Sequence, residues 1–311
     1  MAAVLKDAFR PKIRAMPRAT AVPIVRAGDD DARTDQDLVA AEAPLGVELV
    51  SVQGGSAVRV GVLMRTPGDD LDLIRGWLYT ERIVRHAAEI IAIDLSDRLV
   101  AADSAADSDR PDGSGARAIV TIAASVAIEH VVQHRVLTPT SACGLCGRLA
   151  VDRLQARRDA PALDTQARWT SALVASLPAA LRAAQTVFAE TGGLHAAGLF
   201  GDEGRLEIVR EDIGRHNAVD KVVGAALVAD RLNGRWPILV VSGRAAFEIV
   251  QKAAIAGLSV IVAVGAPSDM AIAAARETDM TLVGFARAGR FNIYAGAERI
   301  DCSMRHGAMG A

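Results

Sequence analysis

Ile238-Leu-Val-Val-Ser-Gly-Arg244 and Val262-Ala-Val-Gly-Ala-Pro-Ser268 each run from a short apolar strand through a glycine into a helix. Strands that alternate with amphipathic helices are typical of a layered α/β domain. Because the strands are uniformly apolar and rich in Val and Ile, we expect central strands covered on both faces. Outward from the two quoted segments, the pattern predicts strands at 206–209, 238–241, 258–264 and 281–285 and helices near 218–229, 245–256 and 269–278.

The ends of the two quoted strands are candidate ligand positions. In α/β sheets, ligands bind beyond the carboxyl ends of the strands, where helix N-termini expose free N–H groups to anions. Ordinary connecting turns are the alternative, because a strand-glycine-helix turn is common in every fold of this kind. Ser242 and Ala266 mark these two strand ends.

The N-terminal part of the chain has a different pattern. Apolar residues at 47–52, a Gly54-Gly55 pair and the alternation at 58–64 predict a β-hairpin, and Asp69 or Asp70 is placed to cap a following helix. A strand is expected at 119–122. We therefore predict a disordered extension over 1–40, a smaller strand-rich α+β domain over 41–135 with a flexible loop at 102–117, the α/β domain over 136–301, and a C-terminal tail over 302–311.

Composition limits the classes of function. The 311 residues include 35 Lys plus Arg against 37 Asp plus Glu, a net charge of -2, which argues against nucleic-acid binding through a broad basic face. The longest apolar runs, such as 258–266, suit buried strands and are too short to cross a bilayer. Three cysteines are too few for a secreted disulfide scaffold, so we expect a cytoplasmic protein.

The most informative motif is Ser141-Ala-Cys-Gly-Leu-Cys-Gly147, in which glycines follow both cysteines. A helix is expected directly after it, at 148–158. A cysteine just before a helix lies at the positive end of the helix dipole, which favours the thiolate over the thiol, and Arg148 adds a nearby positive charge. Cys143 and Cys146 are therefore both candidate nucleophiles.

Three interpretations of this pair remain open from spacing alone. A structural zinc site needs two more ligands, and the remaining Cys302 is far away in sequence. A thioredoxin-like redox motif belongs after the first strand of a βαβ unit and usually has a bulkier centre than Gly-Leu. A nucleophilic sulfur carrier accepts sulfane sulfur as a persulfide on one thiol, while the second thiol can resolve or relay it.

Two histidine-containing motifs lie beside apolar strands. They are Thr191-Gly-Gly-Leu-His-Ala-Ala-Gly198 and Glu211-Asp-Ile-Gly-Arg-His-Asn-Ala-Val-Asp-Lys221. A His-Ala pair with a Cys-x-x-Cys elsewhere is reminiscent of zinc nucleobase deaminases, but those need Glu where Ala197 stands and cysteines after the histidine. Deaminase chemistry is therefore not expected. His195 and His216 can serve either as ligands or as structural hydrogen-bonding groups.

Together these motifs resemble the formate dehydrogenase accessory sulfurtransferase family. The resemblance covers roughly residues 45–301, in the expected order, and the histidine-centred motif is its most specific part. It rests on Cys143-Gly-Leu-Cys-Gly147, the two histidine motifs, Ser242-Gly-Arg244 and Gly284-Phe-Ala-Arg-Ala-Gly-Arg-Phe-Asn-Ile-Tyr294. The fold that it implies is a cytidine-deaminase-like three-layer α/β core with a smaller strand-rich N-terminal domain, without intrinsic metal and as a homodimer.

The resemblance also implies a function and its residues. A cysteine desulfurase donates persulfide sulfur to Cys143, the first cysteine of the pair with Cys146, and the sulfur passes to the molybdenum bis(molybdopterin guanine dinucleotide) cofactor before insertion into the formate dehydrogenase catalytic subunit. The family's cofactor-binding stretch corresponds to Phe285, Ala286, Arg287, Ala288, Gly289 and Arg290.

The residues themselves support the cofactor assignment. Arg287 and Arg290 can pair phosphate oxygens, Gly289 allows close backbone approach, and Phe285 can stack on a ring. A solvated turn between two closing strands is the alternative. The main rival function is a non-catalytic chaperone that only binds and escorts the cofactor, which would not need the cysteine pair.

Overall fold

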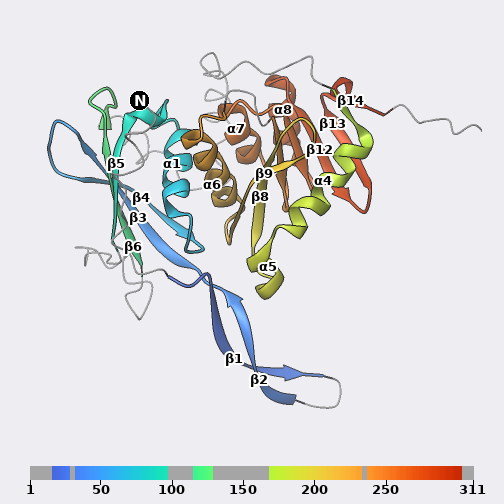
Figure 1. The fold of residues 1–311 in the computed structure, drawn as a ribbon, viewed down its shortest axis with the longest axis horizontal. Helices are drawn as coiled ribbons and strands as arrows, with labels where there is room; N and C mark the ends of the chain where they lie inside the picture. Colours follow the sequence, from blue (N-terminus) through green and yellow to red (C-terminus); the bar gives the residue numbers. More distant parts are fainter. Residues whose placement is uncertain (1–15, 29–31, 97–114, 129–167, 233–236, 303–311) are drawn as a thin grey trace, which may run out of the picture.

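The larger unit of the computed structural model is built on one six-stranded mixed sheet (Figure 1). The structure describes residues 16–28, 32–96, 115–128, 168–232 and 237–302. The order across the sheet is β13 (Arg290–Ala295), β12 (Thr281–Arg287), β11 (Val260–Ala263), β10 (Ile238–Val241), β8 (His195–Phe200) and β9 (Leu206–Asp212). The strands β10, β11 and β12 are parallel, and β8, β9 and β13 run antiparallel to their neighbours.

Helices cover both faces of this sheet. On one face α6 (Arg215–Val228), α7 (Phe247–Ile255) and α8 (Asp269–Glu277) pack on alternate side chains such as Leu199, Leu239 and Ile261. On the other face α4 (Ser171–Ala183) packs on the intervening residues. The mixed α/β fold expected from the sequence is therefore confirmed, as a helix–sheet–helix arrangement, and the cytidine-deaminase-like description of it stays a prediction.

The observed strands differ from the expected ones in two respects. The segment 206–209 belongs to β9, which is an antiparallel edge strand and largely half-buried, so the expectation of a central strand is wrong there. The strand β8 was not expected, although its last five residues are buried. It starts within the polar-looking histidine motif, and the small residues Ala196, Ala197 and Gly198 hide its apolar character.

The N-terminal unit is a four-stranded sheet with one helix on it. The sheet order is β4 (Val58–Arg65), β3 (Ala43–Ser51), β6 (Ala116–Ile122) and β5 (Ile90–Ser96). The helix α1 (Asp70–Thr80) buries Leu73, Ile74, Trp77 and Leu78 against it. The expected hairpin and helix are present, but β6 begins at Ala116, so Ala116 and Arg117 belong to a strand and not to the predicted loop.

The helix α1 also joins the two units, because its other face crosses α6 at very short range (Figure 1). The crossing depends on two glycines. A Cβ atom added at Gly76 would lie 1.7 Å from the carbonyl oxygen of Asp220, and one added at Gly224 would lie 1.9 Å from that of Asp72. The two backbones are therefore in direct contact, and no side chain fits between them.

The predicted disordered extension over residues 1–40 is wrong for its second half. The strands β1 (Ala19–Ala27) and β2 (Ala32–Ala40) pair as an antiparallel ribbon that projects from the body (Figure 1). A short parallel pair, β7 (Trp169–Thr170) with β14 (Ile300–Asp301), joins the two ends of the larger unit. The remaining short elements are α5 (Thr186–Thr191), η1 (Ala87–Glu89) and η4 (Ala297–Arg299). Within the described ranges, no helix is long and apolar enough to span a membrane.

Candidate functional site

The carboxyl ends of the three parallel strands lie side by side and are connected by backbone hydrogen bonds. The Gly265 N–H donates to the Gly243 carbonyl at 3.0 Å, and the Phe285 N–H donates to the Gly265 carbonyl at 3.0 Å. The glycines allow this close approach, since a Cβ at Gly265 would lie 3.1 Å from Arg244 Cα. The turns after β10, β11 and β12 therefore form one continuous edge, which we call the carboxyl edge, at 242–244, 264–268 and 285–290.

The start of β8 adds His195 to the carboxyl edge. The Ala196 N–H donates to Ser242 Oγ at 2.8 Å, and the Ser242 N–H donates to the Ala196 carbonyl at 3.0 Å. The His195 ring lies over Gly243, because a Cβ atom added to Gly243 would be 3.2 Å from His195 Nδ1. The antiparallel strand β8 thus places His195 at the edge of the sheet where the parallel strands end.

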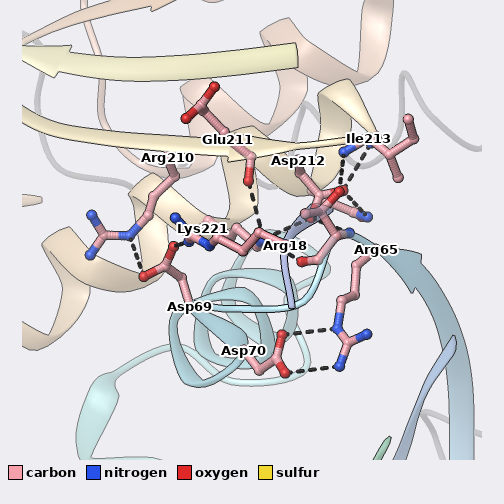
Figure 2. Close-up of polar contacts among 12 residues, drawn as sticks. Arg18, Arg65, Asp69, Asp70, Arg210, Glu211, Asp212, Ile213 and Lys221 are labelled. Carbon is pink, nitrogen blue, oxygen red and sulfur yellow. Dashed lines mark hydrogen bonds and ion pairs between the residues drawn. The ribbon is translucent and has the colours of Figure 1, made fainter. Parts of the chain in front are cut away.

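The motif from Glu211 to Lys221 supplies several structural polar contacts at this edge. Lys221 and Asp212 form a fully buried ion pair at 2.8 Å, shown in Figure 2, and Lys221 also donates to the Thr66 carbonyl at 3.0 Å. The other carboxylate oxygen of Asp212 accepts from the Gly214 N–H at 2.8 Å and from Asn217 Nδ2 at 2.9 Å. Asp212 therefore fixes the first turn of α6.

Two further charged groups of the motif also have fixed partners, and one of them joins the two units. Asp220 accepts from Lys252 Nζ at 2.9 Å and from the Thr80 hydroxyl at 2.7 Å, at the end of α1. The Glu211 carboxylate accepts from the first backbone N–H groups of α5, at Val187 and Phe188. Most polar residues of this motif therefore have a structural role.

Arg215 and His216 are the exceptions. Arg215 Nε and His216 Nε2 are buried atoms that have no hydrogen-bond partner within the part of the chain that the structure describes. Glu248 lies 3.9 Å from His216 Nε2. Burial lowers the pKa of His216 to about 4, with help from the charges of Arg215 and Lys252 and against those of Glu248 and Glu81, so this imidazole is neutral at pH 7.

Positive charge accumulates around His195. Burial lowers the pKa of His195 below its ordinary value, and the charges of Arg215 and Arg244 lower it further, whereas Asp212 raises it. Arg215 lies at the start of α6 and Arg244 in the turn after β10. The two positively charged side chains near His195 therefore come from elements that are far apart in sequence. A neutral imidazole beside two guanidinium groups is suited to binding an anion.

The predicted cofactor-binding stretch forms the turn between β12 and β13. Arg287 pairs with Arg290 across the two-residue turn Ala288-Gly289, whose φ angles of 51° and 73° are both positive, as in a type I′ turn. Phe285 is 41% exposed and also has a positive φ, where β12 is irregular. Ala286 is buried, so Phe285, Arg287, Ala288, Gly289 and Arg290 form the accessible surface and Ala286 anchors it.

The structure therefore brings the Phe285–Arg290 turn, Ser242 and His195 to one edge of the sheet. Cys143 and Cys146 lie outside the described residues. The sequence motifs include Arg215 and Arg244, but the sequence analysis assigned them no role at this edge. Their position could have identified them, because each residue follows a glycine that comes shortly after the end of a strand.

Comparisons with known proteins agree with this arrangement of motifs. Residues 41–301 match the model of the FdhD/NarQ family. The "Sulfur carrier protein FdhD" of Streptomyces coelicolor is 42% identical over 280 residues, which cover 89% of this chain and 94% of that protein. The protein of the same name from Thermoplasma acidophilum is 41% identical over 264 residues, which cover 85% and 87%.

A solved structure has a similar fold. The crystal structure of a protein from Desulfotalea psychrophila, described as a formate dehydrogenase accessory protein, superimposes with a TM-score of 0.66 at 25% sequence identity. The superposition covers 91% of this chain and all of the other chain.

Proposed function

We propose, from the premise that this chain belongs to the FdhD/NarQ family, that it is a sulfur carrier which serves the maturation of formate dehydrogenase. The observation that carries the proposal is the identity of about 40% to sulfur carrier proteins over most of the chain, including the segment with the cysteine pair. In this proposal the protein is a cytoplasmic homodimer without a resident metal, and formate dehydrogenase activity requires it.

The sulfur-transfer step uses the Cys143 thiolate. The thiolate attacks the outer sulfur of a persulfide on a cysteine desulfurase, an S–S bond forms on Cys143, and the desulfurase cysteine leaves as a thiolate. No external oxidant or reductant is needed, because the transferred sulfur keeps its oxidation state. Cys146, which is separated from Cys143 by two residues, then assists release of the sulfur.

The acceptor is the molybdenum bis(molybdopterin guanine dinucleotide) cofactor, bound as a substrate before its insertion into the dehydrogenase. We assign its guanine dinucleotide end to the turn that holds Phe285, Arg287, Ala288, Gly289 and Arg290. In support, the Phe285 ring is exposed for stacking, and Arg287, Ala288, Gly289 and Arg290 are exposed beside it. The sulfur comes from Cys143, which lies in a different part of the sequence.

Intact-mass spectrometry after incubation with a cysteine desulfurase and cysteine tests the sulfur step. We expect the wild type to gain the mass of one sulfur atom, Cys143→Ala to gain none, and Cys146→Ala to gain less. Cys302→Ala is the matched control, since Cys302 is an exposed free thiol at the other end of the chain, and it should load like the wild type.

The same measurement separates this function from its rival. A chaperone that only escorts the cofactor would bind guanine nucleotides but gain no sulfur in any variant. Full sulfur loading of Cys143→Ala would reject Cys143 as the carrier residue.

A further inference from the structure

We infer that Thr66, which belongs to the N-terminal unit, is a positioning residue for the site on the larger unit, because it holds the start of α6 so that the charge of Arg215 lies beside His195. The inference rests on the proposed function, since the carboxyl edge is where we assign the cofactor. Thr66 acts through the backbone of α6 and not through contact with a ligand.

The first argument is that Thr66 directs all its backbone and side-chain bonding towards one motif. It lies in the connection from β4 to α1 and is only 1% exposed. Its N–H donates to Asp212 Oδ2 at 3.2 Å, its hydroxyl oxygen accepts from the Ile213 N–H at 3.1 Å, and its carbonyl accepts from Lys221 Nζ at 3.0 Å (Figure 2). One buried residue of the N-terminal unit therefore holds both the backbone before α6 and a side chain of α6 itself.

The second argument is that the start of α6 needs contacts from outside the helix. The N-cap position is occupied by Gly214, so no side chain caps the helix from there. The N-terminal unit supplies contacts on both sides of this glycine. The Ile213 N–H donates to the Thr66 hydroxyl before it, and Asn217 Nδ2 donates to the carbonyl of Met64 at 2.7 Å after it. The first turn of α6 is therefore tied to the N-terminal unit at two points.

The third argument is that the place of Arg215 depends on this backbone. Arg215 directly follows Gly214, and its Nε atom is buried without a hydrogen-bond partner in the described parts of the chain. No bond at that atom holds the guanidinium group in place. The charge of Arg215 nevertheless acts on His195, whose pKa it lowers together with Arg244. Because the interaction of two charges weakens with distance, a shift at the start of α6 would change this effect.

The hydroxyl group is the part of Thr66 that a substitution can remove selectively. Valine has nearly the same shape as threonine but cannot accept a hydrogen bond, so in Thr66→Val the Ile213 N–H would lose its acceptor. A buried N–H without an acceptor is costly, and we expect the start of α6 to shift until this group reaches water. Thr66→Ser keeps the acceptor and is the conservative variant.

NMR titration of the histidine Cε1–H signals in the full-length protein tests the inference without a ligand. Besides burial, the groups that act on the pKa of His195 are Arg215, Arg244 and Asp212. Because Arg215 lowers this pKa, we expect it to rise towards its ordinary value in Thr66→Val and to keep its wild-type value in Thr66→Ser. The His195 signal is identified with His195→Gln.

A double-mutant cycle distinguishes positioning from a general effect on the fold. Arg215→Gln removes the charge, so it should raise the pKa of His195 at least as much as Thr66→Val does. Adding Thr66→Val to Arg215→Gln should give no further rise, because the charge that Thr66 positions is already absent. Additive rises would show that Thr66 acts on His195 by another route, and they would overturn the inference.

Thr281→Val is the matched control for lost stability. The Thr281 hydroxyl is also buried and donates to the Gly296 carbonyl at 2.9 Å, but Thr281 is the first residue of β12, at the end of the strand away from the carboxyl edge. Thr281→Val should lower the urea unfolding midpoint, as Thr66→Val does, and leave the pKa of His195 unchanged.

Calorimetric titration with GDP measures the consequence for binding at the carboxyl edge. We expect Thr66→Val to bind GDP about tenfold more weakly than the wild type, since a displaced guanidinium group no longer favours the negative charge of the phosphates. Thr66→Ser and Thr281→Val should bind GDP like the wild type.

The outcomes are distinct from those for sulfur transfer. An unchanged pKa of His195 in Thr66→Val would overturn the inference, and so would an equal rise in Thr281→Val. If Thr66→Val does not fold, the smaller Thr66→Ala takes its place, and the same direction of change is expected. Absence of sulfur loading on Cys143 in the wild type would remove the proposed function and leave the result for Thr66 standing.

Discussion

At the residue scale, the charged groups near the carboxyl edge divide into those with a fixed partner and those without one. Asp212 and Lys221 satisfy each other in full burial, and removing either would leave a buried charge unpaired, which costs about 3–5 kcal/mol. Arg215 and His216, only a few residues away, have buried nitrogen atoms without acceptors in the described ranges. The short segment from Asp212 to Lys221 thus holds both kinds of group.

His216 should make the stability of the protein depend on pH. Its pKa is about 4 in the folded chain, against an ordinary value of 6.5, and the groups that face it are Arg215, Lys252, Glu248 and Glu81. Because the unfolded chain takes up a proton that the folded chain does not, the free energy of unfolding should fall as the pH drops from 6.5 towards 4 and be constant above that window. The full effect is at most about 3 kcal/mol.

Urea unfolding at pH 5 and pH 7.5 checks this expectation. His216→Gln should lose most of the difference between the two pH values, whereas His195→Gln, whose pKa is lowered for related reasons, should lose a smaller part. An unchanged difference in His216→Gln would show that the imidazole is protonated in the folded protein.

At the element scale, the crossing of α1 and α6 depends on backbone contact. Gly224→Ala would place a Cβ atom 1.9 Å from the Asp72 carbonyl oxygen and 2.7 Å from the Gly76 nitrogen, neither of which belongs to a flexible side chain. We expect a loss of about 1–3 kcal/mol or more, although alanine favours a helix over glycine by about 1 kcal/mol.

The neighbouring position supplies the control for this change. Ala225→Gly has the opposite effect on helix propensity and should cost only about 1 kcal/mol. Both variants can be compared by their urea unfolding midpoints. A Gly224→Ala variant as stable as the wild type would mean that the backbones of the two helices are not in direct contact.

The sequence predicted the elements whose patterns are locally complete. The strand at Ile238–Val241 and the helix after it could be predicted, because uniform apolar runs and 3.6-residue periodicity are properties of short segments. The edge position of β9 and the existence of β8 depend on pairing between distant segments, which no local pattern contains. The ribbon β1–β2 was missed for the same reason, because its exposed residues resemble those of an unstructured tail.

The candidate site was predictable to a similar degree. The turn from Phe285 to Arg290 and the strand end at Ser242 could be identified from glycines and arginines after apolar strands. That His195 lies over Gly243 could not be predicted, because an antiparallel strand must first insert beside β10. The role of Cys143 as the persulfide carrier stays a prediction, because this residue lies outside the described residues.

At the scale of the whole molecule, the ribbon β1–β2 contributes little to the body. Most of its side chains are exposed, including Val25 at 68%, and its contacts are near its root, where Arg18 pairs with Asp69 and Ala40 lies beside Gly193. Replacing residues 22–37 by Asn-Gly would join the paired residues Ala21 and Leu38 through a two-residue turn. We expect the melting temperature to change by less than about 4 °C.

Differential scanning calorimetry of the shortened protein checks this prediction at several protein concentrations. The control variant Arg18→Gln lacks the ion pair at the root of the ribbon, and its melting temperature should fall more than that of the shortened protein. The opposite result would be a much lower melting temperature of the shortened protein that no longer depends on protein concentration. That result would show that the distal ribbon is buried in an assembly.

The pairing of Trp169–Thr170 with Ile300–Asp301 has a practical consequence for protein engineering. The α/β unit is entered and left through two neighbouring strands, about 4.8 Å apart. A purification tag or fluorescent fusion joined directly after Asp301 would therefore start beside Trp169–Thr170, whereas one joined directly before Ala19 would start at the ribbon β1–β2. Fusions that must leave the β7–β14 pair undisturbed belong on the amino-terminal side, before the ribbon.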